Sequence, residues 1–157
     1  MARIKSVMLT DVPTLKKEGK IEEAARLLSK SQNGCVVILE NNFPIGIVTE
    51  LDIIKKVASD KTNLSETVTR LMSSPVTIMA PSTKLDEALK VIDTKRFRKY
   101  PVVENNKLIG LVTKKDVVHA ISDNIRLHRN IQNVVLVLFV LFEFFVFVFS
   151  KYVPFGA

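Results

Sequence analysis

The sequence predicts an α/β (α+β) fold in which two strand-helix-strand-strand-helix repeats pack as a pseudo-two-fold pair, followed by a C-terminal hydrophobic helix. The first observation is an internal repeat: residues 20–58 match residues 84–122 at a constant offset of 64 positions, with 11 of 39 positions identical. The second is that the hydrophobic period changes in the same order in both copies. The third is a change of composition near residue 130, after which apolar residues dominate.

Each repeat is expected to begin with a short extended piece, around Val12 in the first copy and around Val76 in the second. An amphipathic helix follows, because apolar residues recur at helical spacing over residues 21–28 and 85–92. Two strands come next, joined in both copies by the turn sequence Glu-Asn-Asn, and a second helix closes the unit. The expected divisions are a first repeat at residues 6–60, a linker at 61–71, a second repeat at 72–122 and a hydrophobic tail at 123–157.

The second helix of each copy is preceded by the motif Gly-h-h-Thr-x-x-Asp, where h is apolar, at residues 46–52 and 110–116. The threonine suits the N-cap position and the aspartate the third helical position, so one interpretation is a capping box that satisfies helix N–H groups. The other interpretation is a binding site. A hydroxyl and a carboxylate at a helix N-terminus, beside a glycine, can hold a sugar diol while the helix dipole favours phosphate.

The formal net charge of +7 at pH 7 lies entirely within residues 1–129, because Glu143 and Lys151 cancel in the remainder. A basic chain favours anionic partners: nucleotides, nucleic acid or an acidic lipid surface. The densest basic run spans residues 95–99, and it is either a solvated rim or the phosphate side of a nucleotide cleft. A nucleic-acid track is the weaker interpretation, since Phe97 is the one aromatic residue inside the run.

The sequence offers few residues for catalysis or metal binding. His119 and His128 have no partner residue at ligand spacing on a common face, so no metal site is expected. No Ser/His/Asp or Cys/His set, Walker loop or paired-carboxylate cleft is visible, and an enzyme is not expected. Cys35 is the single cysteine and lies among apolar residues, which predicts a small buried hydrophobe.

The two motif copies in register, with Tyr-Pro-Val-Val at residues 100–103, resemble a tandem of cystathionine β-synthase (CBS) domains, also called a Bateman module. The resemblance covers about residues 6–122. It implies a flat pair of domains with two symmetry-related clefts and a regulatory rather than catalytic role. It also implies that the ligand is an adenine nucleotide (AMP, ADP or ATP) or a related adenosyl compound, with no cofactor required, and that the chain forms a homodimer.

Carried over residue by residue, the resemblance implies that each Thr–Asp pair meets a ribose diol. Basic residues ahead of the second-repeat strand, Arg98 and Lys99, are implied to reach phosphate. The first repeat has neither this basic pair nor the following proline, which predicts two unequal sites. The complete set of expected nucleotide-binding residues is Val12, Gly46, Thr49, Asp52, Val76, Arg98, Lys99, Tyr100, Pro101, Gly110, Thr113, Lys115 and Asp116.

The tail is expected to form a membrane anchor at about residues 131–153. From Val134 to Phe149, 15 of 16 residues are Val, Leu or Phe. As a helix the anchor would be about 34 Å long, enough to cross a hydrocarbon core. Arg126 and Arg129 precede it, so the positive-inside bias places the repeats on the cytoplasmic side. Glu143, near the middle, is expected to face another copy of the chain or a partner helix.

The leading interpretation is a regulatory nucleotide-binding module held at a membrane by its C-terminus. Three alternatives are kept beside it. The first is a soluble, cytoplasmic repeat pair that oligomerises through the tail, as helices or as strands, and does not sense nucleotides. The second is a basic nucleic-acid-binding module, and the third is a subunit that regulates a membrane transporter by contact alone.

Overall fold

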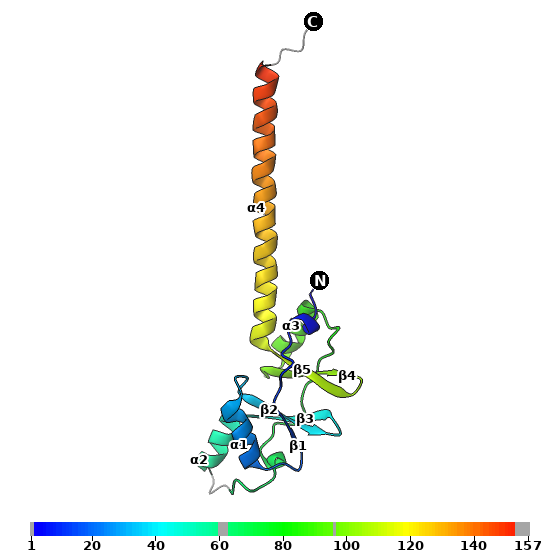
Figure 1. Ribbon diagram of the computed structural model, residues 1–157, viewed down its shortest axis with the longest axis vertical. Coiled ribbons are helices and arrows are strands. Elements are labelled where there is room, and N and C mark those ends of the chain that lie inside the picture. Colours follow the sequence, from blue (N-terminus) through cyan, green and yellow to red (C-terminus); the bar gives the residue numbers. More distant parts are fainter. Residues whose placement is uncertain (1, 60–62, 96, 153–157) are drawn as a thin grey trace. The chain divides into compact units, whose positions relative to one another are not determined.

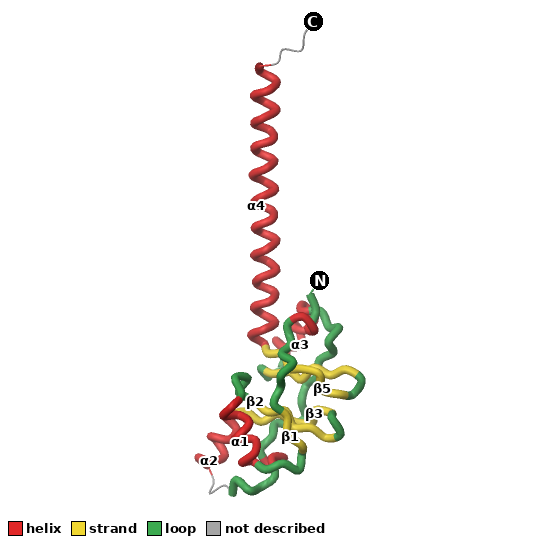
Figure 2. Tube along the Cα trace, in the orientation of Figure 1, coloured by secondary structure: helices red, strands yellow, loops and turns green. Residues whose placement is uncertain are grey.

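The computed structural model describes residues 2–59, 63–95 and 97–152. Asp60 of the expected first repeat, residues 61 and 62 of the expected linker, Arg96 and residues 153–157 lie outside this description. The chain divides into two units, Met1–Val118 and His119–Ala157. In chain order (Figures 1 and 2) the elements are the 3₁₀ helix η1 (Ile4–Ser6), β1 (Thr14–Lys16), α1 (Ile21–Lys30), β2 (Cys35–Glu40), β3 (Phe43–Thr49), α2 (Glu50–Ser59), the 3₁₀ helix η2 (Val68–Arg70), α3 (Leu85–Thr94), β4 (Lys99–Glu104), β5 (Lys107–Thr113) and α4 (Lys114–Tyr152).

The first repeat forms a three-stranded sheet in the order β1-β2-β3. β1 runs parallel to β2, and β2 runs antiparallel to β3. The expected Glu-Asn-Asn turn is confirmed, because Asn41 and Asn42 join the two strands with φ of 51° and 68°, a conformation that asparagine tolerates and that suits a two-residue hairpin. Helix α1 buries Ile21, Ala24 and Leu28, the residues whose helical spacing predicts it.

The second repeat has the same hairpin and helix. β4 and β5 pair antiparallel, and their turn places Asn105 and Asn106 at φ of 50° and 58°. Helix α3 buries Leu85, Ala88 and Ile92, which are the positions equivalent to those buried by α1. The predicted repeat of helix, strand, strand and helix is therefore confirmed in both copies.

The first strand of the second repeat differs from the expectation. The extended piece around Val76 forms no strand within the described residues, and a single parallel bridge, between Met79 and Val102, remains in its place. In the first repeat, two further backbone hydrogen bonds flank β1. Their N–H donors are the residues that correspond, at the offset of 64, to Pro101 and Pro81 of the second repeat. Because proline has no N–H, neither bond can form in the second repeat.

The first residues of each repeat pair with the other repeat. Leu9 and Leu111 exchange two backbone hydrogen bonds of 2.8 Å. The equivalent pair, Ser73 and Ile47, exchanges bonds of 2.8 and 3.1 Å. Equivalent residues of the two repeats thus make equivalent backbone hydrogen bonds, as the predicted pseudo-two-fold relationship requires.

The two 3₁₀ helices, η1 and η2, lie just before these paired residues, and each buries one residue in the core. The sequence predicts a linker at residues 61–71, yet Val68 of η2 is fully buried in the apolar cluster of the first repeat. Its N–H donates to the Gly19 carbonyl at 2.8 Å. Ile4 of η1, the equivalent residue, is also fully buried, and its N–H donates to the Thr83 carbonyl at 2.9 Å. Each half of the unit is thus completed by chain that precedes the opposite repeat.

A shared apolar cluster holds the repeats together. It consists of Cys35, Val37, Ile47 and Leu111, with Val12, Leu39, Val76 and Leu108 packed against it. Several of these residues are related by the offset of 64, as Val12 is to Val76 and Ile47 to Leu111. Because the cluster draws on both copies, we expect neither repeat to keep its full stability without the other.

The last helix of the second repeat and the apolar tail form one element, α4, instead of two. No glycine or proline interrupts the sequence between Lys114 and Tyr152, so nothing in it ends the helix at residue 122. The alternative of a tail made of strands is therefore wrong. Within His119–Ala157, the stretch Arg129–Phe149 is long and apolar enough to cross a membrane, and none of it is buried.

Candidate functional site

Each Gly-h-h-Thr-x-x-Asp motif forms a Thr–Asp pair at a helix start. In the first repeat, Asp52 Oδ2 accepts bonds from the Thr49 N–H at 2.8 Å and from the Thr49 hydroxyl at 2.6 Å. In the second repeat, Asp116 Oδ2 accepts from the Thr113 N–H at 3.0 Å and from its hydroxyl at 2.7 Å. The aspartate N–H returns a bond to the threonine hydroxyl oxygen in both pairs, at 3.4 and 3.2 Å. Both pairs are thus reciprocal helix caps.

Capping does not use the whole carboxylate. All the bonds from threonine converge on Oδ2, so they leave Oδ1 of each half-buried aspartate for another donor. A carboxylate oxygen at a helix N-terminus can accept from the hydroxyl of a sugar, while helix N–H groups attract an anion. The capping interpretation and the diol-binding interpretation are therefore compatible in one pair of residues.

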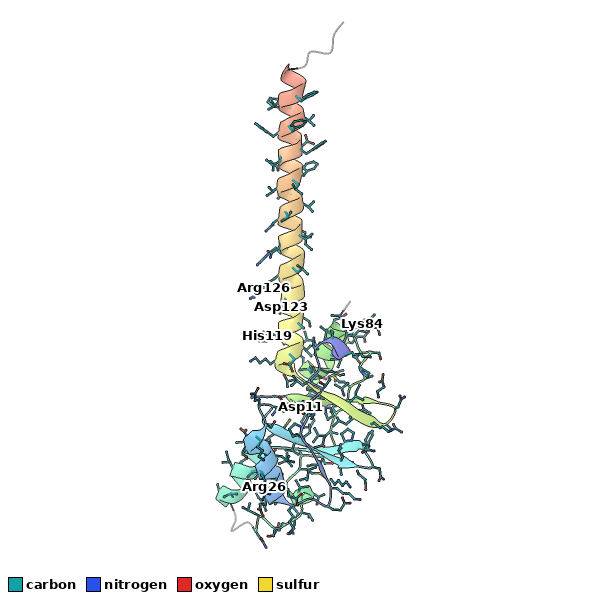
Figure 3. All side chains as sticks on the ribbon, viewed as in Figure 1. Asp11, Arg26, Lys84, His119, Asp123 and Arg126 are labelled. Carbon is teal, nitrogen blue, oxygen red and sulfur yellow. The ribbon has the colours of Figure 1, made fainter. Side chains whose placement is uncertain are left out.

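A cavity of about 720 Å³ lies in the same unit, beside the loop that follows α1. Its described lining consists of Met8, Leu9, Thr10, Asp11, Pro13, Leu27, Lys30, Ser31, Gln32 and Asn33. Asp11, labelled in Figure 3, lies on the segment that leads into β1, and its carbonyl accepts a bond from Asn33 Nδ2 at 3.1 Å. The volume is within the range of small-ligand sites. Neither Thr–Asp pair is among these lining residues.

Lys99 connects the cavity wall to the second Thr–Asp pair. It lies opposite Thr113 in the β4–β5 ladder. Its Nζ donates to the carbonyls of Asn33 and Gly34, both at 2.7 Å. The expected phosphate-binding lysine therefore already bridges the two repeats at the edge of the cavity.

The other basic residues expected at the site face solvent. Arg98 and Lys115 are exposed, and their contact with a ligand stays a prediction. Lys114, next to Lys115, instead pairs with Asp93 at 2.9 Å between Nζ and Oδ1. Because Lys99 turns inward to Asn33, the exposed basic run is shorter than the sequence suggests.

Six of the expected site residues are buried or make packing contacts within the fold. Tyr100 is fully buried and Pro101 is buried, and the Tyr100 hydroxyl donates to the Phe97 carbonyl at 2.8 Å. Burial, with a smaller contribution from Asp93, raises the pKa of the Tyr100 phenol. Val12 and Val76 pack on the shared cluster, and Gly46 and Gly110 lie beneath the methionines ahead of the opposite repeats. A direct contact of these six with a ligand stays a prediction.

The comparisons with known proteins agree with this architecture. The family model for the CBS domain matches the chain twice, at residues 4–59 and 68–123. The chain belongs to the CBS-domain family. Both matches include the short helices η1 and η2.

Similar proteins include CBS-domain pairs of known structure. A CBS-domain containing protein from Agrobacterium tumefaciens is 30% identical, covers 76% of this chain and 98% of its own, and has a TM-score of 0.65. The CBS protein CBSX2, solved in complex with AMP, is 25% identical, covers 78% and 98%, and has a TM-score of 0.64. An uncharacterized protein from Methanopyrus kandleri is 35% identical over 113 residues, which are 71% of this chain and 56% of that protein. The chain thus spans little more than half of that relative.

The sequence implied clefts, but most of the residues that line this cavity were not predicted. Its lining includes Asp11, Lys30 and Asn33, none of which belongs to the duplicated motif. The available signal was Asn-Gly at residues 33 and 34, where Gly34 takes a φ of +56° and turns the loop. That dipeptide predicts a turn. It does not predict that a lysine 65 positions away binds the turn.

Proposed function

We propose that this chain is a non-catalytic regulatory module that binds an adenine nucleotide or a related adenosyl compound between its two CBS domains. The observation that carries the proposal is the duplicated Thr–Asp pair. Each pair presents, at a helix N-terminus, a carboxylate oxygen that has no hydrogen-bond donor among the described residues, and this arrangement recurs at equivalent positions of both domains. AMP in the complex of CBSX2, a pair of the same fold and 25% identity, supports an adenosine ligand.

The polar groups of the unit suit the parts of such a ligand. Asp52 or Asp116 would accept from the ribose hydroxyls, and Arg98, Lys99 and Lys115 would attract phosphate. The cavity lined by residues 8–11, 13, 27 and 30–33 supplies both apolar and polar lining for a base. Because Lys99 occurs in the second domain alone, the two clefts are proposed to differ in their preference for phosphate.

The apolar part of α4 is proposed to anchor the module in a membrane, with the CBS domains on the cytoplasmic side. Support comes from the stretch Arg129–Phe149, whose mean hydropathy is 2.5 and of which none is buried. Arg126 and Arg129 flank its start. Glu143 interrupts the apolar surface, and we propose that it faces a second copy of the chain or a partner helix.

A titration of the full chain in detergent micelles tests the ligand proposal. AMP, ADP, ATP, S-adenosylmethionine and NAD are titrated by calorimetry, with adenosine and GMP as controls for phosphate and base. We expect dissociation constants between about 1 μM and 1 mM for at least one adenosyl compound and weaker binding of GMP. Failure of every adenosyl compound to bind at about 1 mM would contradict the proposal.

Nucleic acid is the competing anion, and the same protein tests it. A single-stranded oligonucleotide that displaces AMP at physiological salt, with an affinity that falls steeply as salt rises, would favour the nucleic-acid alternative. We expect little displacement, because Phe97 is exposed but Lys99, two residues away, is turned inward to the Asn33 carbonyl.

A further inference from the structure

We propose that the polar face of α4, which consists of Arg126, Arg129, Asn133 and Glu143, binds a transmembrane helix of a different protein and not a second copy of this chain. A fitting partner helix has a hydrogen-bond donor inside the membrane and acidic side chains at its cytoplasmic boundary. This inference rests on the proposed membrane anchoring and deepens it, because it decides which of the two proposed occupants meets Glu143.

The four residues of the polar face lie along one side of the helix. Because α4 is continuous throughout this region (Figure 1), positions that recur in alternating steps of three and four residues form a row along it. Arg126, Arg129, Asn133 and Glu143 all belong to one such row. All four are exposed, so the described part of the chain leaves this row open to another helix.

A different row of α4 is apolar throughout and is called the apolar row. Steps of three and four residues define seven rows between residues 126 and 150, and this is the one that contains no polar or charged residue. Its members Leu141 and Phe145 are each two positions away from Glu143. Two residues turn an α-helix by about 200°, so the apolar row and the polar face lie on opposite sides. The apolar row consists of Leu127, Ile131, Val134, Leu138, Leu141, Phe145 and Val148.

The charges of the polar face do not suit a second copy. Two copies anchored from the same side of a membrane run parallel, so a shared row places each residue opposite its own equivalent. Along the polar face Arg126 would meet Arg126 and Arg129 would meet Arg129, and like charges that face one another oppose association. Two Glu143 carboxyls would also meet inside the membrane, where at least one of them would have to take up a proton. Pairing of two copies along the apolar row has none of these costs.

A different helix can complement the same residues. An ionisable group inside a membrane usually pairs with a polar group of a neighbouring helix, and the Glu143 carboxylate accepts hydrogen bonds from an amide, ammonium or guanidinium group. Arg126 precedes Glu143 by 17 positions, which is about 26 Å along a helix. The partner that fits therefore carries a donor inside the membrane and carboxylates about 26 Å away, where Arg126 and Arg129 would meet them.

A designed transmembrane helix serves as the probe. It is built of leucine and alanine, with one glutamine at its centre and two glutamates at its cytoplasmic end, and an otherwise identical helix without the glutamine and glutamates is the control probe. The matched variant of the full chain exchanges two residues, Leu141→Glu with Glu143→Leu. The exchange keeps the composition and moves the carboxylate by about 3 Å in depth, but places it on the apolar row.

Association is measured in the membranes of an expression host, by energy transfer between fluorescent proteins fused to the N-termini of the full chain and of the probe. We expect the full chain to bind the polar probe about threefold or more tightly than the control probe, since hydrogen bonds between membrane helices have this strength. The exchanged variant should lose this preference, and Arg126→Gln should reduce it. A preference that survives unchanged in the exchanged variant would overturn the inference.

Contact between copies is tested by disulfide cross-linking of the full chain in the same membranes. Val140→Cys places a thiol on the row of the polar face, and Leu138→Cys places one on the apolar row. Cys35 is fully buried, and the chain without an added cysteine gives the background. We expect Leu138→Cys to form more dimer than Val140→Cys. More dimer from Val140→Cys, with the excess removed by Glu143→Leu, would overturn the inference and place the second copy on the polar face.

A carbonate wash of these membranes separates the two proposals. A full chain that the wash releases would contradict the proposed anchoring and this inference together. A full chain that stays with the membranes but gives either overturning result would contradict this inference alone.

Discussion

Met72 lies directly against Gly46, so that a Cβ on Gly46 would fall 2.4 Å from Met72 Sδ. The equivalent contact is between Met8 and Gly110, where a Cβ would fall 3.0 Å from Met8 Sδ and 2.7 Å from the Leu9 carbonyl oxygen. In both CBS domains the glycine of the motif makes room for the segment that crosses from the other domain. The glycine is therefore first a packing residue between domains.

Gly46→Ala is expected to lower the free energy of unfolding by about 1–3 kcal/mol, the usual cost of overpacking. Met72→Ala in the same protein removes the clashing side chain, so the double variant should lose less stability than the sum of the two single variants. Urea denaturation of the full chain in micelles measures both. If Gly46→Ala keeps wild-type stability and weakens AMP binding alone, the glycine serves the ligand instead of the domain crossing.

The crossing segments should carry stability of their own. Ile4 is fully buried, and we expect Ile4→Ala to lower the free energy of unfolding by about 2–5 kcal/mol. Ile54→Ala is the matched control because 62% of Ile54 is exposed, and it should change stability by less than about 0.5 kcal/mol. Equal losses in the two variants would show that η1 is not part of the core.

The sequence predicted those features that local pattern determines. The Asn-Asn turns, the helices that bury Ile21 and Leu85, and the Thr–Asp caps follow from turn chemistry, helical spacing and the capping motif. Each is encoded within a few neighbouring residues. Because the two domains are related by an offset of 64 positions, a feature predicted in one domain was also predicted at the equivalent position of the other.

The features that the sequence did not predict are long-range or depend on a missing donor. The pattern of residues 63–71 does not predict that Val68 is a core residue of the first domain, because the buried residues in its cluster lie about 20–50 positions earlier in the sequence. The lost strand near Val76 depends on Pro81 and Pro101, whose missing N–H groups matter only once the strand pairing is known. The turn of Lys99 toward Asn33 is likewise a contact between domains, and spacing within one domain cannot reveal it.

Tyr100 gives a test by pH. Burial raises the pKa of its phenol above the ordinary value of 10.0, so the unfolded chain releases this proton at a lower pH than the folded protein does. The free energy of unfolding should therefore fall as pH rises above about 10. Tyr100→Phe should flatten this decline and cost about 0.5–1.5 kcal/mol at neutral pH, through loss of the bond to Phe97. The protein with Tyr100 and the Tyr100→Phe variant both also carry Cys35→Ala, because burial raises the pKa of the Cys35 thiol too.

Urea denaturation of the Cys35→Ala protein, with and without Tyr100→Phe, between about pH 8 and pH 11 supplies the measurement. A decline of the same slope with and without the phenol would contradict the assignment to Tyr100. A gain in stability with rising pH would contradict the sign of the shift itself.

Membrane anchoring is tested by fractionation of cells that express the full chain. We expect the protein to stay with membranes through a carbonate wash, and a chain ending at Arg129 to be released, because the stretch Arg129–Phe149 supplies the apolar length. Glu143→Leu should keep the protein in the membrane and weaken cross-linking to a second copy or a partner. A full chain found as a discrete oligomer in the soluble fraction, which becomes smaller on deletion after Arg129, would make the tail an oligomer interface.

The most direct test of the central claim measures the ribose contact of Asp52 and Asp116. AMP and its 2′,3′-dideoxy analogue are titrated against the wild-type full chain and against Asp52→Asn with Asp116→Asn. Asparagine still caps a helix, so stability should change by less than about 1 kcal/mol, while a neutral amide cannot replace the carboxylate as acceptor for the diol. We predict that the wild type prefers AMP to the dideoxy analogue by about tenfold or more and that the double variant has lost this preference. An unchanged preference for AMP in the double variant would contradict the account and leave the Thr–Asp pairs as helix caps.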